Sequence, residues 1–159
     1  DELSKDVLFG ISIEINQTPS MLSDQFDIII NSEALSAMSG NYKLVVCLTE
    51  NNIINWQKDG DIDDESYVHK HVLRSFLTPT FGEDLAAEEI NNGDNFSNGY
   101  SPVISTLENN NINHSQNTLT LGNGNAGGWD LNNMYVLAYI YDESNNEILQ
   151  VEEKSLLNK

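Results

Sequence analysis

Two histidines and the single arginine of the chain lie within six residues of one another, at positions 69, 71 and 74. If residues 67–77 form one β-strand, then His69 and His71 project from the same face, because side chains two residues apart share a face. Two imidazoles in this arrangement could begin a zinc site, which would need one or two further ligands. The alternative is that both rings form hydrogen bonds with backbone or carboxylate groups.

Arg74 is the only guanidinium in an acidic chain. A guanidinium forms two parallel hydrogen bonds with a carboxylate, so Arg is well suited to a structural ion pair. We expect Arg74 to pair with a carboxylate such as Glu83.

Residues 59–65 carry five carboxylates in seven positions. The alternate aspartates Asp59, Asp61 and Asp63 resemble the start of a calcium loop, in which oxygens at positions 1, 3 and 5 converge on the ion. The rest of the EF-hand pattern is missing, since position 6 is Asp64 rather than Gly and position 12 is Lys70 rather than Glu. The segment is therefore either a calcium site of another kind or a solvated acidic loop.

Cys47 is the only cysteine, so no disulfide can form within the chain. It lies in an apolar, strand-like run in which Lys43 is the one cation nearby. A buried thiol that packs as a small hydrophobic side chain is the expected structure.

The elements that must position these residues are mostly strands, because the dominant hydrophobic period is two. Strands are expected at residues 7–15, 26–30, 42–49, 67–77, 101–107, 117–121, 134–141 and 147–153. Residues 51–65 read as a long polar loop, and residues 85–90 as the one short helix. This pattern predicts an all-β fold, an antiparallel β-sandwich of seven to nine strands, immunoglobulin-like or jelly-roll-like, with at most one short helix.

The strand at residues 134–141 is apolar on both faces. Its second face carries Tyr135, Leu137, Tyr139 and Tyr141. Strands of this kind are usually covered on both sides, so a loop, a neighbouring domain or a partner must cover the aromatic face. A loop is the simplest cover.

The chain has 159 residues and a formal net charge of -18. This charge argues against nucleic acids and anionic membranes as partners, because phosphate binding depends on cations of the protein. No apolar run is long enough for a membrane span. The chain also contains no nucleophile elbow, phosphate-binding loop or zinc-protease motif.

The segment from Tyr67 to Arg74, followed by Gly82-Glu83 and the final hairpin of residues 129–142 and 147–151, resembles the Omp28-related outer membrane proteins of Bacteroidota. The resemblance covers residues 7–156. It implies an envelope or secreted location and a β-sandwich, and it supplies no catalytic residues. It also implies that residues 1–159 are one domain, the C-terminal part of a longer precursor that often begins with a thioredoxin-like segment.

Two hypotheses on function follow. The first is a non-enzymatic module of the cell envelope that serves binding, adhesion or assembly, with another domain of its precursor or a surface protein as partner. The alternative is a calcium-stabilised accessory domain of a larger thioredoxin-like redox protein or enzyme. A hydrolase with a site of its own is the least favoured.

Overall fold

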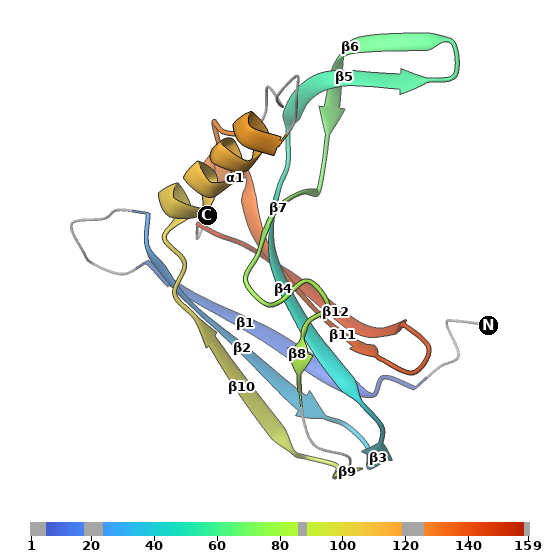
Figure 1. Cartoon of the computed structure of the whole chain (residues 1–159). Helices are drawn as coiled ribbons and strands as arrows, with labels where there is room; N and C mark the ends of the chain where they lie inside the picture. The colour runs from blue at the N-terminus through green and yellow to red at the C-terminus, as the bar shows by residue number, and fades with distance from the viewer. Residues whose placement is uncertain (1–5, 18–23, 86–88, 119–125, 158–159) are drawn as a thin grey trace.

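The computed structural model of the chain describes residues 6–17, 24–85, 89–118 and 126–157. Two antiparallel sheets face each other in these residues (Figure 1). The predicted all-β sandwich is confirmed.

The first sheet contains three strands in the order β1-β2-β10, namely β1 (Phe9–Gln17), β2 (Phe26–Ala34) and β10 (Asn95–Tyr100). The second sheet has the order β12-β11-β4-β7, and β8 also pairs with β4. Its strands are β4 (Tyr42–Glu50), β7 (Val72–Phe76), β8 (Glu83–Asp84), β11 (Met134–Asp142) and β12 (Glu147–Ser155). Alternation of apolar and polar residues had predicted most of these strands, and the final hairpin lies where it was expected.

The core lies between the two sheets and is built from the inward-facing residues of each strand. The alternating set Met134, Val136, Ala138 and Ile140 of β11 is fully buried, and it packs with Leu44, Val46 and Leu48 of β4. The first sheet contributes Phe9, Ile13, Ile15, Phe26, Ile28 and Ile30 to the same cluster. Burial of each large apolar side chain stabilises the fold by roughly 1.5–3 kcal/mol.

A hairpin stands where the sequence had suggested a polar loop. Strands β5 (Ile53–Asp59) and β6 (Ile62–His69) pair with each other only, and they extend beyond the two sheets at one end of the molecule (Figure 1). The prediction of a loop at residues 51–65 was wrong. Ile53, Ile54 and Trp56 supply strand-forming residues among the polar ones, and Gly60 with a φ of 60° makes the tight turn.

The expected single strand at residues 67–77 is two strands. β6 ends at His69 and β7 begins at Val72, and between them His71 has a φ of 51°. This left-handed conformation interrupts a strand, so the alternation that the sequence shows does not continue through it. The chain thereby leaves the hairpin and joins the edge of the second sheet.

The one α-helix of the described residues, α1 (Ile104–Thr118), occupies a segment in which strands were expected at 101–107 and 117–121. Residues 119–121 lie outside the described residues. The carboxylate of Asp24 accepts a hydrogen bond of 2.7 Å from the backbone N–H of Ser105, and the Asp24 carbonyl accepts one of 3.0 Å from that of Ile104. The helix is thus capped by a residue about 80 positions away.

The expected helix at residues 85–90 lies partly outside the described residues. Its last two residues form the short strand β9 (Glu89–Ile90), which pairs with β3 (Met38–Ser39). A 3-10 turn, η2 (Leu131–Asn133), leads into β11.

Candidate functional site

A pocket lies where the projecting hairpin meets the edge of the second sheet, and we call it the hairpin-base pocket. Its volume is about 420 Å³, within the range of roughly 300–1,000 Å³ that ligand sites occupy. The hairpin, β7 and α1 all contribute to its lining, which consists of Ile53, Asn55, Trp56, His69, Val72, Leu73, Arg74, Ser75, Phe76 and Asn111.

Arg74, in the wall of this pocket, forms a buried ion pair with Glu50. Nε of Arg74 donates to Oε2 of Glu50 at 2.7 Å, and the two side chains are only 6% and 5% exposed. The prediction that Arg74 pairs with Glu83 was wrong. Glu83 instead accepts hydrogen bonds from the Tyr100 hydroxyl and the Asn98 amide. Strand pairing explains the difference: Glu50 lies opposite Val72, and this register brings its carboxylate next to Arg74.

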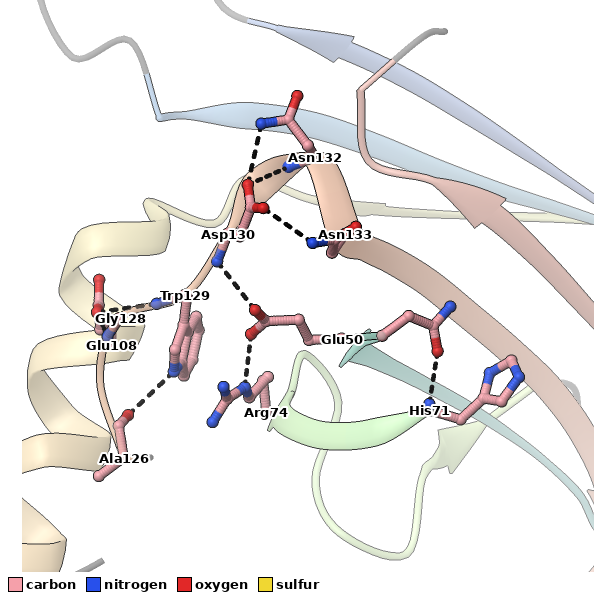
Figure 2. Close-up of polar contacts among 11 residues, drawn as sticks. Glu50, His71, Arg74, Glu108, Ala126, Gly128, Trp129, Asp130, Asn132 and Asn133 are labelled. Atoms are coloured by element: carbon pink, nitrogen blue, oxygen red, sulfur yellow. Dashed lines mark hydrogen bonds and ion pairs between the residues drawn. The ribbon is translucent and has the colours of Figure 1, made fainter. Parts of the chain in front are cut away.

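Two further groups contact the ion pair. The backbone N–H of Asp130 donates to Oε1 of Glu50 at 3.0 Å, and the guanidinium of Arg74 lies over the ring of Trp129, 5.6 Å from its centroid (Figure 2). A cation over an aromatic face is an attractive arrangement. The pair therefore joins β4, β7 and the segment before β11 in one buried polar cluster.

The segment before β11 is held by its own hydrogen bonds. Oε1 of Glu108 in α1 accepts from the backbone N–H groups of Gly128 and Trp129, and the indole of Trp129 donates to the Ala126 carbonyl at 3.0 Å. The carboxylate of Asp130 accepts from the backbone N–H of Asn132 at 3.0 Å and so caps η2 (Figure 2). These contacts fix Trp129 against Arg74.

His69 and His71 do not share a strand face, so the expectation of two imidazoles side by side was wrong. Nε2 of His69 lies 3.3 Å from the Trp56 carbonyl within the hairpin. Nδ1 of His71 lies 3.1 Å from Oε1 of Glu153, and its backbone N–H donates to the Asn51 side chain. The two rings thus make hydrogen bonds with backbone and carboxylate groups, the second of the two expected arrangements.

The three aspartates proposed for calcium lie around the tip of the hairpin. Asp59 ends β5 opposite Ile62, Asp61 is in the turn, and Asp63 lies opposite Lys58. Among the described residues, no group of three His, Cys, Asp or Glu side chains is arranged to hold a metal ion. Calcium binding at Asp59, Asp61 and Asp63 stays a prediction.

Cys47 is buried, as its apolar surroundings predicted. Burial, together with the charge of Glu153, raises the pKa of its thiol to about 11. The thiolate is therefore scarce at neutral pH, and Cys47 is a packing residue rather than a nucleophile.

A loop covers part of the aromatic face of β11, as expected. Residues 77–82 cross β4, and the Tyr141 hydroxyl donates to the Phe81 carbonyl at 2.8 Å. Gly82 has a φ of 78°, and a Cβ there would lie 2.7 Å from the Leu44 carbonyl oxygen, so only glycine fits this close approach. Phe81 itself remains 81% exposed.

Sequence reasoning did not single out Glu50, Trp56 or Trp129 as site residues. Glu50 ends a strand and Trp129 follows a glycine-rich segment, and only strand pairing shows that they meet at Arg74. One signal was available for Trp56, since an aromatic residue between two isoleucines and an acidic turn is unusual for a solvated loop.

None of the helices among the described residues has both the length and the apolar character that crossing a lipid bilayer would require. No curated protein gave a significant match to the chain.

Two solved structures from Porphyromonas gingivalis share the fold. HBP35 matches with a TM-score of 0.60 and 16% identity over 94% of this chain, which spans 41% of the length of HBP35. A domain of the outer membrane lipoprotein Omp28 matches with a TM-score of 0.52 and 15% identity, covering 94% of this chain and 88% of that domain. At such identities the likeness concerns the fold alone.

The family model described as outer membrane protein Omp28 matches residues 8–159, almost the whole chain. The resemblance inferred from the His-x-His segment and the final hairpin is confirmed. The chain belongs to the Omp28 family of outer membrane proteins and is a protein of the bacterial cell envelope.

Proposed function

We propose that this domain is a non-enzymatic binding module of the cell envelope, and that it binds a partner through the β5–β6 hairpin and the hairpin-base pocket. The observation that carries the proposal is the exposed apolar surface of this hairpin. Ile54 is 66% and Trp56 57% exposed, and Tyr67 and Val68 are each 45% exposed. Apolar side chains gathered on one projecting element mark an interaction surface.

The shape of the hairpin supports the same proposal. A two-stranded hairpin whose strands pair with no other strand is marginally stable in water, since it buries little apolar surface. Ile54 and Val68 lie directly opposite each other in the register, which places both on one face. A partner that covers this face would bury both side chains and stabilise the hairpin.

The ionisable side chains in and near the pocket take part in structural contacts. Arg74 and Glu50 neutralise each other, His69 contacts a backbone carbonyl, and burial raises the pKa of the Cys47 thiol. This use of the polar groups supports binding rather than catalysis as the role of the domain.

Site-specific photo-crosslinking in the bacterium that makes the protein tests the proposal. Benzoylphenylalanine replaces Ile54 in one variant and Val7 in another, two apolar positions that are 66% and 58% exposed. We expect a discrete envelope adduct from position 54, because the photophore there would lie within the interface.

Position 7 is the matched control, since it precedes β1 and lies outside the hairpin. The same adducts from both positions, or no adduct from position 54, would contradict a binding surface on the hairpin. Far-UV circular dichroism of each purified variant confirms that the fold is retained.

A further inference from the structure

The edge of β7 next to the pocket is free of any strand partner among the described residues. β7 is the last strand in the order β12-β11-β4-β7. In an antiparallel sheet, alternate N–H and C=O groups of an edge strand point away from the sheet. Such an edge can accept another extended chain as a further strand.

The hairpin-base pocket runs along this edge. All five residues of β7, Val72–Phe76, line it, and the hairpin and α1 form its other walls. Leu73 is 48% and Trp56 57% exposed, so a strand added at this edge would lie beside exposed apolar side chains of β7 and of the hairpin.

The chemistry of the lining favours a polypeptide backbone as the ligand. Arg74 carries a positive charge in the lining of the pocket, and its ion pair with Glu50 neutralises that charge. The other polar groups are the side-chain amides of Asn55 and Asn111, the Ser75 hydroxyl and the His69 ring. These groups recognise a neutral, hydrogen-bonding chain rather than a phosphate or a carboxylate.

The net charge of the chain sets the sign of the charge that a partner should carry. Residues 59–65 at the hairpin tip carry five carboxylates, and the whole chain has a net charge of -18. A second copy of this chain would be repelled, whereas cationic side chains would be attracted. The complementary ligand is a peptide that combines apolar and basic residues.

We infer that the hairpin-base pocket binds an extended segment of a basic, apolar protein, which adds to the free edge of β7 as a further strand. The inference rests on the proposed function and names the partner class and the binding mode.

The test uses the whole chain and three fluorescein-labelled nonapeptides. The first alternates lysine and valine, the second alternates glutamate and valine, and the third is the lysine peptide with the backbone nitrogens of its valines methylated. Fluorescence anisotropy measures the affinity of each. We expect the lysine peptide to bind and the glutamate peptide not to bind. Methylation should weaken binding by at least about tenfold, since it removes several backbone hydrogen bonds to β7 at once.

Variants of the protein test whether the lysine peptide binds at the hairpin-base pocket. Trp56→Ala and Leu73→Ala should each weaken the binding of the lysine peptide by about fivefold or more, because each removes an apolar contact. Ile148→Ala, an exposed residue of β12, is the matched control and should leave the affinity unchanged.

Equal affinity for the methylated and unmethylated lysine peptides would show simple charge attraction and overturn the inference, as would a lysine peptide that does not bind. In either case, an adduct from position 54 in the crosslinking experiment would still support the proposed binding function. The failure of strand addition is thereby distinguishable from the failure of the proposed binding function.

Discussion

Glu50 and Arg74 show how hydrogen bonds and packing can offset the desolvation free energy of two buried charges. The carboxylate accepts from Arg74 and from the Asp130 backbone, and the guanidinium packs on Trp129. Desolvation of two charges is expensive, and it is offset only when the geometry is good and the remaining polar atoms are bonded. The loss of one partner therefore removes the opposite charge that offsets the desolvation of the other.

We predict that Glu50→Ala lowers the free energy of unfolding by about 3–5 kcal/mol, because it removes the carboxylate that pairs with the buried guanidinium of Arg74. Urea unfolding followed by circular dichroism measures the change. The double variant Glu50→Leu with Arg74→Met should lose much less than the sum of the two single variants. A loss below about 1 kcal/mol for Glu50→Ala would show that the pair is not a structural clamp.

The sequence predicted an ion pair for Arg74 and missed its partner. Residue type alone indicated that a lone guanidinium in an acidic chain would find a carboxylate. The choice between Glu50 and Glu83 depends on the bulge in the β4–β7 pairing, between Leu48 and Thr49. That register is a tertiary property, and no local pattern encodes it.

At the scale of elements, strands with one buried face were predictable and the remaining segments were not. In α1, Ile104, Leu107 and Ile112 have helical spacing, but the asparagines between them are poor helix formers and obscured it. The helix also depends on a distant cap, Asp24, whose pKa is lowered mainly by the hydrogen bond of the Ser105 side chain.

We predict that Asp24→Ala costs about 1 kcal/mol of stability at neutral pH, as the loss of a helix cap does. Because the pKa of Asp24 is lowered in the folded state, its contribution is complete above its ordinary value of 3.8. The contribution is lost as the pH falls through the lower, folded-state value. Urea midpoints of wild type and variant should therefore converge in acid, and a difference that does not change with pH would contradict the cap.

At the scale of the whole molecule, the net charge of -18 opposes compaction, because like charges repel across the surface. The densest part of that charge lies at the hairpin tip. A cation bound there would relieve repulsion and stabilise the native state, which links the calcium hypothesis to global stability.

If Asp59, Asp61 and Asp63 bind calcium, millimolar calcium should raise the thermal midpoint of wild type relative to a chelator, since a ligand of the native state alone adds stability. The triple variant with Asn at these positions should show no such difference. Its absolute midpoint can change because three charges are lost, so the calcium-dependent difference is the measurement. An unchanged wild-type midpoint would contradict the site.

The position of β11 between β4 and β12 also has a consequence for the order of folding. β4 (Tyr42–Glu50) finds its central neighbour only when Met134–Asp142 has been made, about 90 residues later. Pairings so distant in sequence are slow to form. During synthesis the larger sheet must therefore stay open between β4 and β12 until residues 134–155 have been made, and β4 keeps one unpaired edge until then.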